Sequence, residues 1–393
     1  MFIVGIDIAK RSHEAIVIND LGNVVKKAFN FKNDRRGFSK LLDTLNGIST
    51  NPSDFVIGME STAHYWLSIY SNLKKIGYTV RVLNPIQSNA LRGLYIRQVK
   101  NDEHDCFIIA EVIRFGRHPQ GELPPPQLYE LRELCRARVF VVDVVADLKR
   151  KVIALLDQVF PEYENIFANI FGDTSSELLR NCSTPEEILA IDTNKLAKIL
   201  EGPSRRRFST AKAQEIKQTA QNSFGIVMGF NTMGLLIKQH MDHIRYTEMQ
   251  VAEIDAKIAE IFSKFNTHLT TIPGIGITLG ATIFSEIGDI SRFSSATKLA
   301  AFAGIDPTVK QSGEFTGTHN HMSKRGSPYL RRAIWQASTI AVIHNPNLKA
   351  FFDKKRAEGK SYMTVIGHVT KKLTNIIFAV LRDQKPYYSN PIL

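Results

Sequence analysis

The spacing of hydrophobic residues along the first part of the chain predicts alternating strands and helices. Runs rich in β-branched and aromatic residues predict three adjacent strands at Phe2–Ile8, His13–Ile18 and Val24–Phe31. The pattern then predicts a helix at Phe38–Leu45, a strand at Asp54–Met59, a helix at His64–Ile76 and a strand at Tyr78–Leu83. This order of elements is typical of an α/β domain.

A run of three prolines, Pro124 to Pro126, interrupts this pattern and predicts a domain boundary near residue 120. After it, Leu128–Val159 has the spacing of a long helix, and residues 231–265 predict a second one. In the second segment, Ile237 and Ile244 begin a series of apolar residues seven apart. The two helices fit an antiparallel hairpin inside one subunit as well as a coiled coil between subunits.

The rest of the chain gives a weaker pattern. Residues 160–230 predict small helices and loops, and residues 267–385 predict a unit that is helical throughout. We therefore expect three domains: an α/β domain at 1–122, a helical hairpin or coiled-coil region at 123–265 with small helices inserted, and a mainly α domain at 266–393.

Composition indicates a soluble protein with an anionic partner. The chain of 393 residues has a net charge of +12, and residues 305–385 alone hold 14 Lys and Arg against five acidic residues. Three scattered cysteines suit a reducing compartment and indicate neither a disulfide framework nor a zinc site. A signal peptide and a membrane span are not expected, so we expect a cytoplasmic, nucleoid-associated protein.

Four carboxylates occupy positions that suit a metal site. Asp7 lies inside an apolar strand, where a carboxylate is costly unless it is paired or bound to a metal. Glu60 follows an apolar strand, and Asp102 and Asp105 lie three apart at the start of a predicted helix. Such a set can bind two Mg²⁺ ions for phosphoryl transfer. Taken on spacing alone, Asp102 and Asp105 fit equally well as charges favoured by the helix dipole.

The C-terminal basic region contains serines beside cations. Ser312 lies in a glycine-containing loop, and Ser323 and Ser327 lie among Lys and Arg residues. A serine hydroxyl can attack a phosphate when a base or metal takes its proton and positive groups stabilise the charge. Position alone does not separate the three serines, and a plain turn residue is the more common role for each.

The segment Ile272 to Gly276, of sequence Ile-Pro-Gly-Ile-Gly, is similar to the turn of a helix-hairpin-helix motif. In that motif the backbone N–H groups of a glycine-rich turn approach a DNA phosphate. A plain turn between two helices explains the same sequence. We expect the nucleic-acid contacts to come from this turn and from the flanking cations, at Lys10, Gly274, Gly276, Lys324, Arg325, Arg331 and Arg332.

Several motifs together resemble the DEDD transposases of bacterial insertion sequences, the IS110 family, which are related to Piv-type DNA invertases. The resemblance rests on ordered motifs at both ends of the chain, namely Gly5–Lys10, Met59–Trp66, Lys100–Asp105, Ile272–Gly276, Phe302–Pro307, Ser312-Gly313, Ser323–Gly326 and Leu330–Arg332. The sequence departs from the family pattern at Asn101, Cys106 and Ser327, none of which is a ligand position.

This resemblance implies a ribonuclease-H-like (RuvC-like) N-terminal domain in which Asp7, Glu60, Asp102 and Asp105 bind Mg²⁺. It implies that Ser312 is the nucleophile and forms a covalent phosphoserine intermediate with DNA. It also implies a composite site shared between protomers, a dimer that becomes a tetramer when active, and guidance by a bridge RNA. Three other functions remain open: a junction-resolving nuclease that uses water, a protein-guided DNA invertase, and a non-enzymatic nucleic-acid-binding regulator.

Overall fold

The computed structural model describes most of the chain, which forms two compact units, Met1–Leu123 and Pro124–Leu393. The described residues are 1–61, 63–83, 85, 88, 102–116, 124–202, 208–226, 228–308, 311–312, 315–316 and 321–388. The first unit ends next to the three prolines. The further division of the second unit near residue 265 stays a prediction.

The first unit is a mixed five-stranded sheet with helices on both faces. Its elements are β1 (Phe2–Asp7), β2 (Ser12–Asn19), β3 (Val24–Lys32), α1 (Arg35–Asn46), β4 (Phe55–Glu60), α2 (Trp66–Ile76), β5 (Thr79–Leu83) and α4 (Asp102–Arg114), with a 3₁₀ turn at Pro52–Asp54. The strand order is β3-β2-β1-β4-β5. β1, β2 and β3 pair antiparallel, whereas β4 lies parallel to both β1 and β5.

These strands and helices confirm the α/β order expected from the sequence. The helix expected from Phe38 begins three residues earlier, because the Asp34 side chain accepts a hydrogen bond from Gly37 N and caps the first turn. The helix expected from His64 begins at Trp66 and ends at Ile76, because the left-handed backbone of Gly77 (φ +105°) stops it.

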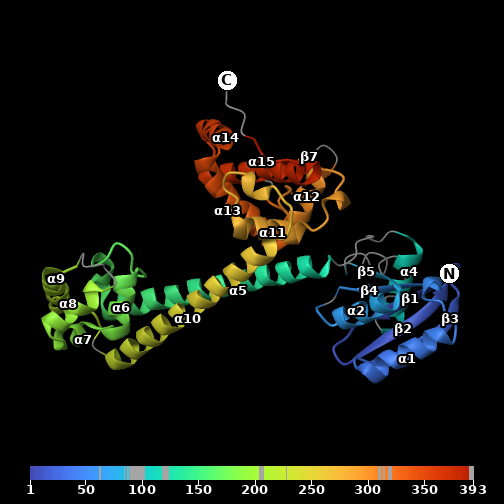
Figure 1. Ribbon diagram of the computed structural model, residues 1–393, viewed down its shortest axis with the longest axis horizontal. Helices are drawn as coiled ribbons and strands as arrows, with labels where there is room; N and C mark the ends of the chain where they lie inside the picture. The colour runs from blue at the N-terminus through green and yellow to red at the C-terminus, as the bar shows by residue number, and fades with distance from the viewer. Residues whose placement is uncertain are drawn as a thin grey trace. The chain divides into compact units, whose positions relative to one another are not determined.

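The second unit is built around two long helices, α5 (Pro126–Val159) and α10 (Phe230–Phe262) (Figure 1). Arg138 of α5 binds Asp255 of α10 and Lys149 binds Glu248, at 2.5 and 2.7 Å, so the two helices run antiparallel. Within this chain the two helices therefore form an antiparallel hairpin, whereas a coiled coil between subunits stays a prediction.

Four short helices follow α5 and form a small core of their own with it and α10: α6 (Asp173–Asn181), α7 (Pro185–Ala190), α8 (Thr193–Glu201) and α9 (Thr210–Gln221), after a 3₁₀ turn at Pro161–Asn165. They gather at one end of the hairpin (Figure 1). Chain leaving this group returns to the end of α5, where Ile226 N donates to Gln158 O at 2.8 Å. At Gly225 an added Cβ would lie 2.0 Å from Val159 O, so this return needs glycine.

The C-terminal part of the second unit is a helical bundle with one short hairpin. Its helices are α11 (Ile277–Ile287), α12 (Ala296–Ala303), α13 (Pro328–His344), α14 (Pro346–Ala357) and α15 (Tyr362–Asp383), with 3₁₀ turns at Leu269–Thr271 and Ile290–Arg292. The prediction that this region is helical throughout was wrong at β6 (Gln311–Ser312) and β7 (Phe315–Thr316), which pair antiparallel. Two-residue strands are too short to leave a hydrophobic pattern.

A buried carboxylate joins the bundle to the long hairpin. Glu286 of α11 is 3% exposed and accepts hydrogen bonds from Arg136 of α5 (2.6 Å) and from Ser327 at the start of α13 (2.8 Å). A buried carboxylate needs such partners, because an unpaired buried charge is strongly unfavourable. The arginines that the sequence places in α5 therefore serve in part as intramolecular ties. None of the described helices is long and apolar enough to cross a membrane.

Candidate active site

Side chains of the first unit alternate between two faces of the sheet. Val4 and Ile6 of β1 belong to the hydrophobic core shared with α1 and α2, whereas Ile3 belongs to the core shared with α4. Successive strand residues point to opposite faces, so Gly5 and Asp7 share the face of Ile3. Asp7 therefore lies at the end of β1, on the face that α4 covers.

The same alternation places Glu60 beside Asp7. In β4, Met59 belongs to the core under α1 and α2, and Glu60 follows it on the opposite face. β1 and β4 are parallel, with Ile6 opposite Met59 as the last pair of the register. Asp7 and Glu60 are the next residues of the two strands, and both are half-buried. Both carboxylates thus lie at the carboxyl end of neighbouring parallel strands.

Helix α4 lies directly on the backbone of these strands because glycines face it. A Cβ atom at Gly5 would lie 2.0 Å from the carbonyl oxygen of Cys106 and 2.7 Å from Ala110 N. At Gly58, which is opposite Gly5 in the register, it would lie 2.5 Å from Ile113 Cγ1. The paired glycines therefore set the height of α4 above the sheet.

The direction of α4 brings its first turn to the end of the sheet that carries Asp7 and Glu60. Its last residue, Arg114, lies beside the turn between β2 and β3, where a Cβ at Gly22 would be 3.3 Å from Arg114 Nε. That turn is next to the beginning of β1, since Phe2 pairs with Asn19. The N-terminus of α4 must then lie towards the opposite end, where β1 finishes.

Asp102 is the first residue of α4 and Asp105 is half-buried one turn later. All four predicted carboxylates therefore belong to segments that meet at one end of the sheet. Among the described side chains, no group of three His, Cys, Asp or Glu residues is arranged to hold a metal ion, and the side chain of Asp102 is outside this set. Binding of a metal by the four residues stays a prediction.

Two residues near Glu60 and Asp7 escaped the sequence reasoning. The fully buried Ser88 donates a hydrogen bond to Glu60 Oε1. Glu14 lies opposite Asp7 in the antiparallel register of β1 and β2, on the face shared by Ile16 of the α4 core. Counting the alternation back from Ile16 would have found Glu14. Nothing in the sequence around Ser88 indicated its contact with Glu60.

Ser312 lies on the short hairpin of the second unit, opposite Phe315 in the register of β6 and β7. The base of this hairpin is fixed by backbone hydrogen bonds from Thr308 N to His321 O and from Ser323 N to Asp306 O, both 2.8 Å. The side chain of Ser312 is outside the described set. The nucleophilic role of Ser312 therefore stays a prediction.

The other two candidate serines have structural hydrogen bonds. The Ser323 hydroxyl donates to Asp306 Oδ1 and so holds the base of the hairpin together. The Ser327 hydroxyl donates to the buried Glu286 and accepts from Leu330 N at 3.1 Å, which caps α13. Both hydroxyls are engaged in maintaining the fold around the hairpin.

The predicted nucleic-acid contacts differ in how accessible they are. Lys10, Lys324 and Arg325 are exposed, and Lys324 has a left-handed backbone (φ 53°), which is uncommon for a residue with a side chain. Arg331 donates to the carbonyl of Ala303 at 3.2 Å, and Arg332 forms a bidentate ion pair with Asp143 of α5.

The glycine-rich turn before α11 contains two glycines in different surroundings. Gly274 has φ +98°, and a Cβ there would lie 2.7 Å from Ala341 N, so packing against α13 already requires glycine. Gly276 is exposed, and a Cβ there would meet nothing within 4 Å. Contact of either glycine with a phosphate stays a prediction.

His13 is buried on the opposite face of the sheet from Asp7. Its Nδ1 accepts a hydrogen bond from Ala9 N at 3.2 Å, and its ring packs against Phe31 at 5.2 Å between centroids. Burial lowers the pKa of His13 below its ordinary value of 6.5, although a hydrogen bond with Asn33 opposes this shift. The neutral imidazole is therefore part of the turn that carries Lys10.

We expect the stability of the first unit to fall as the pH is lowered below 6.5, because protonation of His13 is easier in the unfolded chain. The folded pKa is the lower one, so the stabilisation is complete above pH 6.5 and is lost as the pH falls towards the folded pKa. Urea unfolding at several pH values measures the slope. His13→Asn should flatten it, whereas the exposed His64→Asn should not; equal slopes for wild type and His13→Asn would exclude this role.

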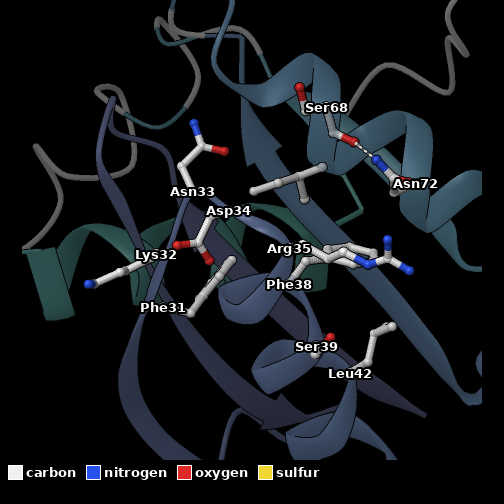
Figure 2. Close-up of a pocket in the computed structure, with 11 residues that line it drawn as sticks. Phe31, Lys32, Asn33, Asp34, Arg35, Phe38, Ser39, Leu42, Ser68 and Asn72 are labelled. Carbon is white, nitrogen blue, oxygen red and sulfur yellow. Dashed lines mark hydrogen bonds between the residues drawn. The ribbon is translucent and has the colours of Figure 1, made fainter.

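A pocket of about 620 Å³ lies at the carboxylate end of the sheet, on the face of α1 and α2 (Figure 2). Phe31, Phe38 and Leu42 give it an apolar lining, and Ser68 and Asn72 face them from α2. Asn72 Nδ2 donates to Ser68 O at 2.8 Å within this helix. The pocket is on the other side of the sheet from Asp7 and Glu60 and is separate from their site.

Comparison with known sequence families gives two matches in this chain. Residues 4–161 match a family described as "Transposase", the DEDD transposase domain of the IS110 type. Residues 266–353 match the "Transposase IS116/IS110/IS902 family". The first match includes the four carboxylates, and the second includes Ser312 and the basic residues that follow it.

Curated relatives are similar over nearly the whole chain at low identity. A 43.6 kDa protein of insertion element IS110 from Streptomyces coelicolor is 24% identical over 80% of this chain and 78% of its own length. A 42 kDa protein of insertion element IS900 from Mycobacterium paratuberculosis is 24% identical, with coverage of 98% and 96%. A pilin gene-inverting protein from Moraxella bovis is also 24% identical, with coverage of 98% and 97%.

The two family matches together cover most of the fold, in the order that the motifs of the sequence predict. Relatives of insertion elements extend the similarity through the helical middle of the chain. The chain therefore belongs to the IS110/IS116/IS902 family of transposases, enzymes of insertion sequences that cleave and rejoin DNA.

Proposed function

We propose that the chain is the transposase of an insertion sequence, with a ribonuclease-H-like (RuvC-like) N-terminal domain and a serine nucleophile in its C-terminal domain. The observation that carries the first half is the convergence of β1, β4 and the start of α4 at one end of the sheet. Three antiparallel strands followed by parallel crossovers, with helices on both faces, are the arrangement expected of that fold.

We propose that Asp7, Glu60, Asp102 and Asp105 hold Mg²⁺. Carboxylate oxygens are the ligands that this hard ion prefers, and the hydrogen bond from Ser88 orients Glu60. When bound, Mg²⁺ supplies positive charge to a scissile phosphate and to the oxygens that enter and leave. A bound cation would also explain why the apolar strand β1 contains the half-buried Asp7, because the cation offsets the cost of desolvating the carboxylate.

In the proposed chemistry, Ser312 Oγ attacks a phosphorus atom of the DNA backbone and forms a phosphoserine ester. The bond from phosphorus to one deoxyribose oxygen breaks, that oxygen takes up a proton, and the serine proton goes to a nearby base. A deoxyribose hydroxyl of a second strand then attacks the ester and releases the serine. The number of phosphodiester bonds is conserved, so no energy source is needed.

The structural roles of Ser323 and Ser327 support the choice of Ser312. Each of those hydroxyls donates to a carboxylate of the fold, so its use as a nucleophile would break the base of the hairpin or uncover Glu286. Ser312 lies on a short strand pair rather than in a packed helix. Lys324 and Arg325, which follow the hairpin in the sequence, add positive charge that favours a phosphate ligand.

We further propose that the two domains of different protomers share one active site in a tetramer, and that a bridge RNA guides the choice of DNA target. The resemblance of the motifs at both ends of the chain supports these two steps. The DNA beside the gene tests the second one: a structured non-coding region whose loops pair with the element junction and with the target is expected. Absence of such a region would favour a target that the protein reads directly.

A site-specific DNA invertase is the second candidate. The pilin gene-inverting protein of Moraxella bovis matches 98% of this chain, which is as much as the insertion-element relatives match. The proposed chemistry is the same for both, because inversion and transposition differ in the arrangement of the DNA sites. Recombination assays with directly and inversely repeated sites separate them.

We expect a covalent protein–DNA adduct when the full chain is incubated with Mg²⁺ and DNA that carries the element ends. The adduct should survive denaturing gel electrophoresis, release a phosphoserine peptide at position 312 after digestion, and disappear when the metal is chelated. Cleavage of the same DNA without any adduct would instead favour a junction-resolving nuclease that uses water. Adduct formation without metal would contradict the role of the four carboxylates.

A further inference from the structure

A groove of about 630 Å³ lies between α14, α15 and the chain that follows α15. Lining residues recur at three- to four-residue spacing on α14 and so share one face of that helix. The groove combines aromatic rings, amines and one amide, from Asn347, Phe351, Lys354, Lys372, Tyr387 and Tyr388. It belongs to the second unit alone and includes none of the residues assigned above to cleavage.

Positive charge in this groove is not compensated by the surrounding protein. Residues 346–388 contain nine Lys and Arg but three acidic residues. The acidic three are engaged elsewhere, as Asp353 pairs with Lys349, Glu358 with Lys355 and Lys360, and Asp383 with Arg382. Within the described part of the chain, Lys354 and Lys372 have no acidic group at ion-pair distance. The two lysines are therefore available for an anionic ligand.

One aromatic ring of the groove is held in place by hydrogen bonds, and the ring that follows it is open to solvent. Tyr387 is fixed at both ends, because its N–H donates to Thr271 Oγ1 at 2.8 Å and its hydroxyl accepts from Asn345 Nδ2 at 3.0 Å. Tyr388 follows it and is 76% exposed. The ammonium of Lys372 lies 4.4 Å from the centroid of the Phe351 ring. A nucleotide can bind such a pair of groups, because its base stacks on the flat ring and its phosphate binds the cation.

We propose that this groove binds unpaired nucleotides of a DNA strand, with a base stacked on Tyr388 and neighbouring phosphates held by Lys354 and Lys372. A DNA duplex keeps its bases stacked on one another, so it offers no base face to an aromatic ring. An acidic peptide would satisfy the lysines but would leave the exposed ring unused. The choice of DNA as the polyanion rests on the transposase family of this chain, whereas the groove itself rests on its own residues.

Binding of a fluorescent oligothymidylate to the full chain tests this proposal, with fluorescence anisotropy as the readout. We expect Tyr388→Ala to weaken binding about fivefold or more, as stacked aromatic residues do, and Tyr388→Phe to keep most of the affinity because the ring remains. We expect Lys354→Ala with Lys372→Ala to lower the slope of log affinity against log salt by about 1.4, since each lost phosphate contact lowers it by about 0.7.

Matched controls separate this groove from general positive charge. Lys349→Ala removes a lysine of the same helix that is already paired with Asp353, and Tyr246→Ala removes a tyrosine of α10 that is 63% exposed. Both should bind like wild type. The proposal would be overturned if these controls lost as much affinity as the groove variants. It would also be overturned if the groove variants lost as much affinity for a DNA duplex of the same length, or if they lost affinity only for oligouridylate, the RNA counterpart of the probe. The measurement needs no recombination, so it stands or fails independently of Ser312.

Discussion

Replacing Ser312 with alanine should abolish strand exchange, with a loss of about 10⁴-fold or more, while leaving DNA binding close to that of wild type. A methyl group cannot form the phosphoserine ester, whereas the hairpin that carries residue 312 is held by backbone hydrogen bonds at its base. Asp7→Ala should give a similar loss, because it removes one of the four carboxylates. A plasmid recombination assay, with DNA binding measured in parallel, checks both variants.

Two other serines provide controls of a different kind for this experiment. Ser323→Ala and Ser327→Ala remove hydroxyls that donate to Asp306 and Glu286, so we expect reduced thermal stability with activity retained in the folded protein. They should still form the covalent adduct. Full activity of Ser312→Ala would remove Ser312 from the mechanism. Loss of the adduct in Ser323→Ala protein that is still fully folded would contradict the assignment of the nucleophile to Ser312 in place of Ser323.

Gly5→Ala should destabilise the first unit by roughly 3 kcal/mol or more, because the new methyl group meets the backbone of α4. Its Cβ would lie 2.0 Å from Cys106 O, and a helix backbone cannot move aside as a side chain can. Displacement of α4 would also move Asp102 and Asp105 away from Asp7. Urea unfolding measures the stability, and hydrogen exchange of the α4 amides reports the displacement.

Alanine substitutions at other glycines of the same unit should lower the stability by smaller amounts, which gives a scale for the loss at Gly5. Gly58→Ala meets the flexible Ile113 side chain at 2.5 Å, so we expect a smaller loss than at Gly5. Gly47 has a helical backbone and ordinary contacts of 3.5 Å, so Gly47→Ala should change the stability by less than about 1 kcal/mol. A loss at Gly5 no greater than that at Gly47 would mean that α4 does not rest on the backbone of β1.

Runs of β-branched and aromatic residues predicted the strands of the first unit, because β1, β2 and β4 have helices on both faces and bury most of their side chains. Periodicity also predicted α5 and α10 as two long helices, and Ile237, Ile244 and Ile258 are buried at intervals of seven or fourteen residues. It did not separate a hairpin from a coiled coil between subunits. Asp7 was found because a carboxylate within an apolar strand needs an explanation. Such signals are local, and the sequence shows them directly.

Contacts between distant segments could not be predicted in this way. Ser88 meets Glu60 although the sequence around it has no period, and Glu286 meets Arg136 across 150 residues. Gly274 was interpreted as a point of approach for DNA, although its closest neighbour is the backbone of α13. Glycine permits close approach by any backbone, and the sequence alone does not tell which one approaches.

The chain leaves α5 after Gln158 and returns to the same place at Ile226, where Ile226 N donates a backbone hydrogen bond to Gln158 O. The four small helices between these points therefore form an insertion with its entrance and exit side by side, with a core largely of its own. A tight turn could join α5 to α10 in its place without changing the path of either helix. A change in the length or content of this segment would thus leave the two ends of the protein in place.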